Sequence, residues 1–376
     1  MKILMLAWEF PPNIVGGLGR HSYNLVKALS KLGINIDLFL PRGEYTIIPG
    51  VDYTILPEEI KFSVYSSIQN LNMTYSDLIG RVMAYADSAA RAAIKKNFDI
   101  IHANDWLTAL AGVKIKELTG KKLIMTIHST EYTRTIGHPW KFIEDIERMA
   151  VQKADVVVTV SEYSKKMISD LYGIPLEKIK VIYNAIDESE YSKRRLNANS
   201  KLVLYVGRLS PQKGVDHLIR AFKIVSQSDK DAVLGIAGEG PELEKLVDIS
   251  IDLNLQGKVV FFGRVSEDEL RFLYSIASVF VMPSVSEPFG ITALEAIASR
   301  VPTIISIESG VSEVVNNTFK VNFWDSNQMA DIILGILNYS EVGEELSKNA
   351  YTEIKKLTWE NSAKQFIDIY KQLLTS

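Results

Sequence analysis

The chain of 376 residues contains no cysteine. This absence excludes disulfide bonds, zinc sites built on thiolates and a cysteine nucleophile. The chain also lacks an excess of charge of one sign, since 42 Lys and Arg residues nearly balance 45 Asp and Glu residues and the net charge is −3. The chain therefore has no overall attraction to nucleic acid or to an anionic membrane, and an anionic ligand must be held by a local site.

Long hydrophobic runs are missing as well. The first residues, MKILMLAWEF, form a short apolar run that is broken by Glu9 and by two prolines. A signal peptide needs a longer apolar region, and a membrane span needs about 20 apolar residues. We therefore expect a cytoplasmic protein. Three lysine pairs are expected to be solvated helix ends, with peripheral contact to an acidic membrane surface as the alternative: Lys95-Lys96, Lys121-Lys122 and Lys165-Lys166.

Several patterns that mark catalytic or metal sites are also absent. There is no His-x-x-x-His or Cys pattern for zinc, no Gly-x-Ser-x-Gly elbow of a hydrolase and no Gly-Lys-Ser/Thr phosphate loop. The string Asp229-Lys230-Asp231 has the form of a metal-binding motif, but it lies in a polar turn before a predicted strand. We expect neither a metal nor a cofactor.

What the sequence does contain is a regular alternation of short apolar runs with helix-period stretches, which predicts an α/β fold with parallel sheets covered on both faces. A helix is expected from about Arg20 to Leu32, and residues 46–76 show no clear period. Strands are predicted at residues 3–7, 34–40, 100–101, 123–127, 156–160, 179–183, 202–206, 232–237, 259–262, 279–282 and 303–307.

The length predicts two domains, because one ordinary core does not extend over 376 residues. The polar segment 187–200 is interpreted as a linker between an N-terminal domain, 1–186, and a second domain, 201–357. Each domain would be a Rossmann-like, doubly wound parallel sheet. Such sheets bind ligands outside the carboxyl ends of their strands, so the expected site is a cleft that the two domains face.

Three loops that follow predicted strands could carry chemistry. In the first, Gly16 and Gly17 precede a helix whose N-terminal amides suit a phosphate, although the glycines could also serve only a tight turn. In the second, Arg208 and Lys213 are five positions apart and could reach one diphosphate, where positive charge would stabilise a departing nucleoside diphosphate. The alternative is a pair of solvated loop cations.

The third loop, residues 286–295, places Glu287 before Gly290 and Glu295 after it. Amides near Gly290 and Ile291 would point at an anion. Glu295, about one turn into the next helix, could accept hydrogen bonds from a ribose diol, and Glu287 would lie nearer the sugar end of the same ligand. An exposed helical acid is the alternative for Glu295. His102 and His128 end two strands of the first domain, where a lone histidine is either structural or part of a ligand site.

Taken together, these loops resemble those of glycosyltransferase family 4, the retaining enzymes of the GT-B architecture. The resemblance rests on Gly16-Gly17, on the 207–214 stretch, and on the pair Glu287 and Glu295, in the order and spacing of the family. It covers nearly the whole chain and includes the last helix, beginning near Thr358 and ending at about 376, which would cross back onto the first domain. Segments 8–12, 15–21, 102–106 and 126–131 are similar to glycogen and starch synthase-like members.

The resemblance implies a UDP- or ADP-glucose donor and an α-glucan acceptor, with no nucleic acid as partner. It implies that backbone near Arg264-Val265 holds the base and Glu295 the ribose. Arg208 and Lys213, with amides at Gly17 and Gly290, would neutralise the diphosphate. His128 and Glu287 would orient the hexose; Asp105 and His102 are placed on the acceptor side. Two positions depart from bacterial glycogen synthases: Ile14 replaces a lysine, and Asn104 replaces the second histidine of His-Ala-His-Asp-Trp.

Other interpretations of the same sequence stay open. A transferase of this family could glycosylate a lipid-linked or glycoprotein glycan instead of a glucan. An epimerase acting on a nucleotide sugar, or a catalytically inactive sugar-nucleotide-binding subunit, could be built on the same architecture. Release of nucleoside diphosphate only when acceptor is added would distinguish transfer from epimerisation.

Overall fold

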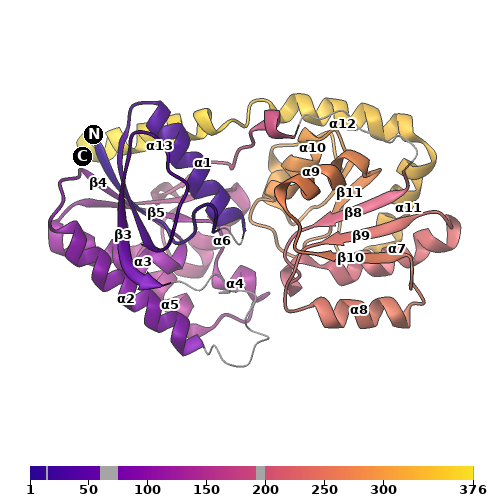
Figure 1. Cartoon of the computed structure of the whole chain (residues 1–376), viewed down its shortest axis with the longest axis horizontal. Helices are drawn as coiled ribbons and strands as arrows, with labels where there is room; N and C mark the ends of the chain where they lie inside the picture. Colours follow the sequence, from indigo (N-terminus) through magenta and orange to yellow (C-terminus); the bar gives the residue numbers. More distant parts are fainter. Residues whose placement is uncertain (14–15, 60–74, 192–199, 376) are drawn as a thin grey trace. The chain divides into compact units, whose positions relative to one another are not determined.

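A computed structural model of the chain describes all residues except 14–15, 60–74, 192–199 and 376. Ile14 and much of the predicted linker therefore lie outside the described residues. The chain divides into two compact units: unit 1 comprises Met1–Asn184 together with Trp359–Ser376, and unit 2 comprises Ala185–Thr358 (Figure 1). Among the described residues, no helix is both long enough and apolar enough to cross a membrane.

Unit 1 is built on a seven-stranded parallel sheet with the order β3-β2-β1-β4-β5-β6-β7. Its strands are β1 (Lys2–Leu6), β2 (Asn35–Arg42), β3 (Val51–Glu59), β4 (Ile100–Asn104), β5 (Lys122–Ile127), β6 (Val156–Thr159) and β7 (Ile179–Val181). Its helices are α1 (Gly17–Lys31), α2 (Tyr75–Ala93), α3 (Asp105–Thr119), α4 (Glu131–Arg134), α5 (Lys141–Lys153), α6 (Glu162–Tyr172), the short η1 (Leu176–Lys178) and α13 (Trp359–Thr375).

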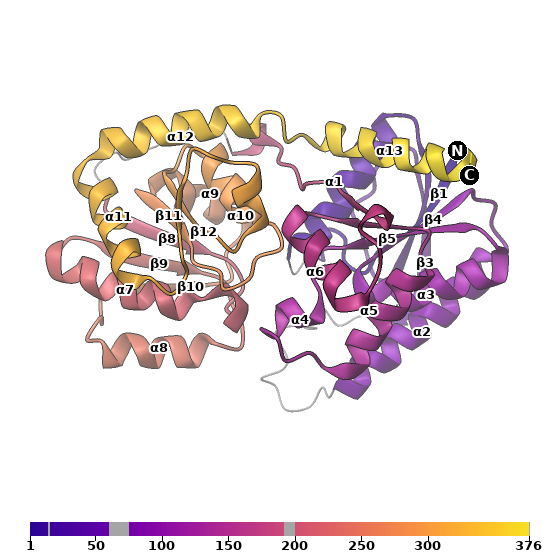
Figure 2. The same cartoon turned by 180° about the vertical axis from the view of Figure 1, so that it is seen from behind.

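Alternate residues of the central strand β1 enter two different cores, because successive side chains of a strand point to opposite faces. Ile3 and Met5 pack with residues of α1 and α13. Leu4 and Leu6 pack with residues of α2, α3, α5 and α6. All four are fully buried, which explains why this strand appears in the sequence as a continuous apolar run. Figure 2 shows the helices that pack with Leu4 and Leu6, α2, α3, α5 and α6.

Unit 2 is built on a six-stranded parallel sheet with the order β10-β9-β8-β11-β12-β13. Its strands are β8 (Leu202–Val206), β9 (Val233–Ala237), β10 (Val259–Gly263), β11 (Val279–Met282), β12 (Thr303–Ser306) and β13 (Phe319–Val321). Its helices are η2 (Glu188–Glu190), η3 (Pro211–Lys213), α7 (Val215–Ser228), α8 (Leu243–Asp252), α9 (Glu267–Ile276), α10 (Ile291–Ala298), η4 (Gly310–Glu313), α11 (Ser326–Asn338) and α12 (Ser340–Ile354).

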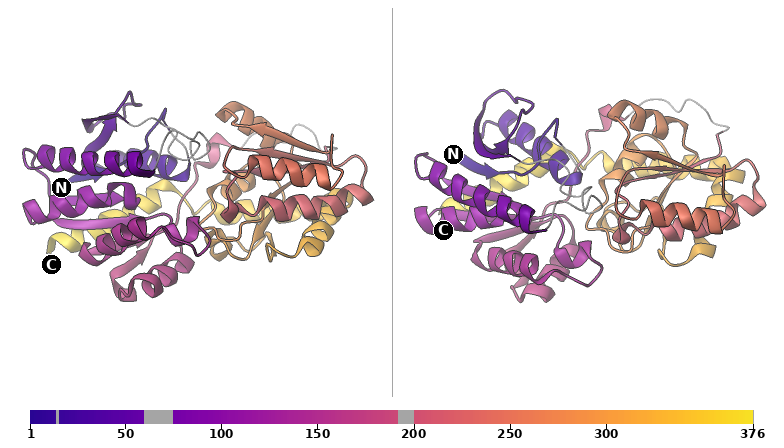
Figure 3. Two further views of the ribbon diagram at one scale, coloured as in Figure 1. Left: turned by 90° about the horizontal axis from the view of Figure 1, so that it is seen from below. Right: turned by 60° about the horizontal axis from the view of Figure 1, so that its bottom comes forward.

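The predicted fold class of two Rossmann-like parallel-sheet domains is confirmed, with helices on both sides of each sheet (Figure 3). Two strands were not predicted. β3 lies in the stretch without clear periodicity, and β13 is only three residues long. Helix α1 begins at Gly17, three residues before the expected start.

Candidate active site

The loops that the sequence singles out in unit 2 follow neighbouring strands. β8 lies between β9 and β11 in the sheet, and the loops after these three parallel strands all leave at their carboxyl ends. The chain runs from β8 to its neighbour β9 and on to β10. It then returns to form β11 on the opposite side of β8. This is a topological switch point, the position where doubly wound sheets bind their ligands.

Two glycines allow these loops to touch through their backbones. Gly214 has a φ of +62°, and a Cβ added there would lie 2.3 Å from the carbonyl oxygen of Pro283 in the loop after β11. Gly238 has a φ of +144°, and its Cβ would lie 1.8 Å from the carbonyl oxygen of Gly207. No other residue fits either contact, so the loops after β9, β8 and β11 form one interlocked backbone surface.

Lys213 and Glu287 are brought together at this surface. The Lys213 Nζ lies 2.6 Å from Glu287 Oε2, and the Ser284 hydroxyl donates to the same oxygen at 3.2 Å. The Glu287 side chain is only 10% exposed and the Lys213 side chain 20%, so water screens this ion pair incompletely. Arg208, in the same loop as Lys213, is half-buried, and its carbonyl accepts a hydrogen bond from the Tyr205 hydroxyl.

The third loop ends at the start of α10. Gly290, with a φ of +110°, is the residue before the first helical residue, Ile291. The first amides of a helix have no carbonyl partner within it, and the helix dipole makes this end attractive to an anion. Val265 follows β10 at the same edge of the sheet and is half-buried.

Glu295 is buried rather than exposed, which removes the alternative of a solvated helical acid. Its side chain is 1% exposed, its Oε1 accepts from the Tyr191 hydroxyl at 3.1 Å, and its Oε2 accepts from the Tyr274 hydroxyl at 3.0 Å. A buried carboxylate needs such donors because an isolated charge in the core is very costly. Two tyrosine hydroxyls thus meet Glu295, and its predicted contact with a ribose diol stays a prediction.

In unit 1, the glycine loop already holds a carboxylate of the protein. The N–H of Gly16, the residue that precedes α1, donates to Glu9 Oε2 at 3.3 Å, and Glu9 is 3% exposed. Gly17 is the first residue of the helix. The arrangement agrees with the preference of helix N-termini for negative charge.

His128 and Asp105 meet at the carboxyl ends of β5 and β4. The main-chain N–H of His128 donates to Asp105 Oδ1 at 2.7 Å. Asp105 has a φ of +52°, an uncommon backbone conformation for a residue other than glycine. Burial raises the pKa of Asp105 to about 6, against the opposing effect of Arg134. Burial also lowers the pKa of His128 to about 3, with a smaller contribution from His102.

His21 joins this group, and sequence analysis did not select it. Its ring lies 4.2 Å from the ring of His128 between centroids, and its Nδ1 lies 2.8 Å from Asn184 Oδ1. The Nε2 atoms of His21 and His128 are both buried and have no hydrogen-bond partner within the described part of the chain. The signal for His21 was weak, because a single histidine in an amphipathic helix is usually structural.

The expectation that His102 faces an acceptor does not agree with its position. His102 is fully buried, its Nδ1 lies 2.8 Å from the Tyr370 hydroxyl of α13, and its Nε2 lies 2.7 Å from Thr126 Oγ1. Both ring nitrogens are therefore used within unit 1, because His102 points into the core between β4 and α13. It fixes this helix to the sheet.

The predicted site residues thus form one group in each unit. In unit 2, the candidates lie on the loops after the strands or on the helical turns that follow these loops: Arg208, Lys213, Val265, Glu287, Gly290, Ile291 and Glu295. In unit 1, Asp105 and His128 are in contact, Gly16 precedes α1 and Gly17 is its first residue. Among the described residues there is no group of three or more histidines and acids that could hold a metal ion.

Two Rossmann-like units in one chain, each with candidate ligand-binding groups at the carboxyl edge of its sheet, are the GT-B architecture. The family model described as Glycosyltransferase Family 4 matches residues 15–190, and the model described as Glycosyl transferases group 1 matches residues 187–353. The chain belongs to glycosyltransferase family 4.

Individual relatives agree with this assignment. An uncharacterized glycosyltransferase from Methanocaldococcus jannaschii is 34% identical over 99% of this chain and 98% of its own length. The glycogen synthase of Mycobacterium tuberculosis is 30% identical over 84% of this chain and 80% of its own length. The solved catalytic domain of starch synthase IV from Arabidopsis thaliana, bound to ADP and acarbose, has a TM-score of 0.77 at 17% identity and covers 100% of this chain and 99% of its own, a likeness of fold.

Proposed function

We propose that this glycosyltransferase is a retaining hexosyltransferase that moves glucose from UDP- or ADP-glucose to an α-glucan acceptor. The observation that carries the proposal is the Lys213–Glu287 pair at the switch point of unit 2, with Nζ and Oε2 2.6 Å apart. A cation at this place favours departure of a nucleoside diphosphate, and an acid beside it can accept hydrogen bonds from sugar hydroxyls. The glycogen synthase relative supports the choice of glucose and glucan.

In this proposal, unit 2 holds the donor. Lys213 and Arg208 neutralise the diphosphate with the first amides of α10 at Gly290 and Ile291. Glu287 orients the hexose. Glu295 accepts hydrogen bonds from the ribose hydroxyls in place of those from its two tyrosine partners. Backbone at Val265 contacts the base.

Unit 1 supplies the acceptor side and part of the phosphate contact. His128 would orient the hexose, and Asp105 would contact the acceptor. The amide at Gly17, and the amide at Gly16 once Glu9 releases it, would reach the diphosphate. The bond between the sugar C1 and the phosphate oxygen breaks, the acceptor oxygen bonds to C1 on the same face, and the departing phosphate oxygen takes the acceptor's proton. The low pKa of His128 supports a neutral imidazole as hydrogen-bonding group. His102 acts only through the packing of α13.

Because these groups belong to different units, transfer would require the two units to close around one donor. Small-angle scattering with and without nucleoside diphosphate tests this part of the proposal. We expect a smaller radius of gyration in the presence of nucleotide, and identical profiles at saturating nucleotide would contradict closure.

The donor and acceptor are tested together. Calorimetry with UDP, ADP and GDP identifies the nucleotide, and radiolabelled UDP-glucose and ADP-glucose are then incubated with glycogen, maltooligosaccharide, glucose 1-phosphate and a lipid extract. We expect label in glycogen or maltooligosaccharide. Label in the lipid extract alone would overturn the glucan acceptor, and folded protein that binds none of the three nucleotides would overturn the donor.

A further inference from the structure

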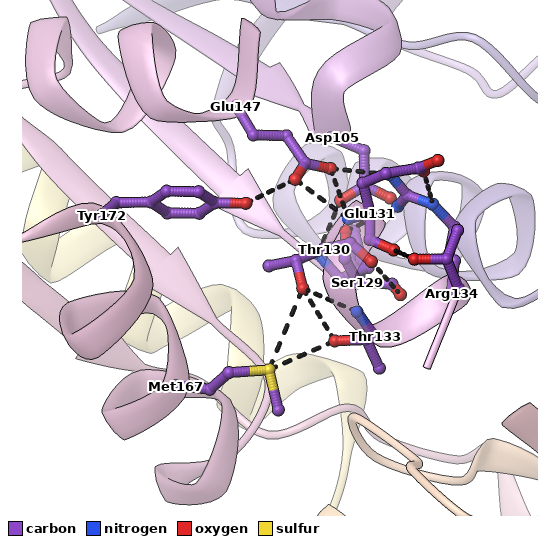
Figure 4. Close-up of polar contacts among 11 residues, drawn as sticks. Asp105, Ser129, Thr130, Glu131, Thr133, Arg134, Glu147, Met167 and Tyr172 are labelled. Atoms are coloured by element: carbon purple, nitrogen blue, oxygen red, sulfur yellow. Dashed lines mark hydrogen bonds and ion pairs between the residues drawn. The ribbon is translucent and has the colours of Figure 1, made fainter. Parts of the chain in front are cut away.

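The loop that follows β5 carries His128 and is held in place by a buried charge from another helix. Figure 4 shows Glu147 with Tyr172 and with the loop residues Ser129, Thr130, Glu131, Thr133 and Arg134. Glu147 lies on α5 and its side chain is fully buried. It is not adjacent in sequence to any residue proposed above to act in transfer.

Within the described part of the chain, Glu147 accepts hydrogen bonds from the loop and from one neighbouring helix. Both carboxylate oxygens accept the N–H of Glu131, at 3.0 and 2.9 Å. Oε1 also accepts from the Arg134 guanidinium at 2.7 Å, and Oε2 accepts from the Tyr172 hydroxyl of α6 at 2.5 Å. Glu147 therefore joins α5 and α6 to the first turn of α4.

Arg134 connects Glu147 to the backbone next to His128. Its second terminal nitrogen donates to the carbonyl oxygen of Ser129 at 2.8 Å, and its Nε donates to Glu131 Oε2 at 3.0 Å. Ser129 is the residue after His128, whose own N–H is held by Asp105. The backbone at positions 128 and 129 is thus fixed on one side by Asp105 and on the other by Arg134 and Glu147.

A network of this kind is a poor way to stabilise a core. Burial raises the pKa of the Glu147 carboxyl, although Arg134, Tyr172 and the Glu131 amide oppose this shift. Replacing buried ion pairs by apolar residues of the same volume is often neutral or stabilising. What such a network does provide is one fixed geometry, and here the fixed element is the loop that presents His128.

We propose that Glu147 is a positioning residue for sugar transfer: through the Glu131 amide and Arg134, it holds the 128–134 loop so that His128 is placed for reaction. This inference rests on the proposed function. Glu147 itself does not touch substrate. Its loss would displace His128 relative to a donor that unit 2 binds normally.

The test uses the full chain and three substitutions. Glu147→Gln keeps the shape and removes the charge, and Tyr172→Phe removes one donor to Glu147 with little risk to folding. The matched control is Asp145→Asn on the same helix, where the Asp145 side chain is 56% exposed and pairs with Lys141. For each variant we measure kcat, KM for the donor and calorimetric Kd for the nucleoside diphosphate. We divide kcat by the fraction of molecules in which unit 1 is folded, which urea unfolding gives.

We expect a fall in corrected kcat of about tenfold or more for Glu147→Gln and about threefold for Tyr172→Phe, because small displacements of a catalytic group are costly. KM and Kd should stay within about twofold, and the control should keep its kcat. A merely structural role would instead reduce the fraction of molecules in which unit 1 is folded and leave the corrected kcat unchanged. That outcome for both variants would overturn the proposal.

Hydrogen exchange separates this inference from the proposed function. In the free protein, the amides of residues 128–134 should exchange faster in Glu147→Gln than in the wild type, whether or not any sugar donor is used. Unchanged exchange would overturn the positioning role. A different result would overturn the proposed function alone. In that case the wild-type protein would neither bind nucleotide nor transfer glucose, while the Glu147→Gln variant would still show the faster exchange.

Discussion

At the scale of single residues, Lys213 is the side chain on which the proposed chemistry depends most. We expect Lys213→Ala to lower kcat/KM by roughly a hundredfold, about 3 kcal/mol, since it removes a preorganised charge from the departing diphosphate. Lys245→Ala is the control, because Lys245 is exposed on α8 and pairs with Glu242 three positions before it. Steady-state kinetics checks the prediction, and near-normal turnover of Lys213→Ala would remove its role at the diphosphate.

Tyr191 is a residue whose importance is visible only in the structure. Tyr191→Phe leaves the buried Glu295 with one donor fewer, and we expect it to lower the free energy of unfolding of unit 2 by about 1.5 kcal/mol, the usual contribution of a hydrogen bond to a charged group. Urea unfolding followed by tryptophan and far-ultraviolet signals measures this loss. Tyr339→Phe, at a tyrosine that is 67% exposed, should change nothing. An equal midpoint for wild type and Tyr191→Phe would show that the hydroxyl contributes no stability.

At the scale of elements, the contact between the loops after β8 and β11 lets us predict how much stability is lost when a glycine is replaced. Gly257→Ala, where φ is +73° and no atom lies within 4 Å of the new Cβ, should cost about 1 kcal/mol from backbone strain alone. Gly214→Ala has a similar φ of +62° but also meets the Pro283 carbonyl, so we expect more than about 3 kcal/mol and weaker nucleotide binding. Thermal unfolding and calorimetry measure the two effects. Equal losses in the two variants would mean that the loops do not need this contact.

The central strands were predictable because their signals are strong. β8 and β11 were placed with correct bounds, since each is a short apolar run between polar turns. β3 was not predictable, because an edge strand with Pro57 and half-exposed residues has neither a continuous apolar run nor a clean alternation. Short elements such as β13 obtain their conformation from the neighbouring strand rather than from their own sequence.

The candidate site was predictable where a loop motif carries several unusual residues at once. Lys213, Glu287 and Gly290 belong to such motifs, and the structure brings Lys213 and Glu287 into contact. The partners of a site residue were harder to find. Glu147 had one signal, because it lies on the apolar stripe formed by Ile143, Ile146 and Ala150, where an acid is unexpected.

At the scale of the whole molecule, four buried groups of unit 1 make its stability depend on pH. Burial lowers the pKa of His102 and of His128 to about 3, and that of His21 well below its ordinary value. Their unfolded-state pKa is about 6.5, so unfolding takes up protons below this pH and stability falls as the pH is lowered. Asp105 acts in the opposite direction, since its raised pKa of about 6 means that the folded state binds its proton first.

Burial also raises the pKa of Glu147, which therefore acts in the same direction as Asp105. We expect the histidines to dominate, so that the free energy of unfolding of unit 1 falls by at most about 3 kcal/mol between pH 7 and pH 5.5. Urea unfolding at several pH values measures it. His138→Gln is the control, because His138 is exposed and should leave the slope unchanged. A stability that does not change over this range would show that the histidines become protonated in the folded protein.

The division of the chain has a consequence for the order in which the protein is made. Unit 2 is one uninterrupted stretch, whereas unit 1 is completed by α13, whose Phe366 and Tyr370 fill its core. During translation the ribosome releases residues 185–358 before it releases α13. We therefore expect the usual N-to-C order of domain folding to be reversed, with unit 2 reaching its native state while the first 184 residues still await the helix that closes them.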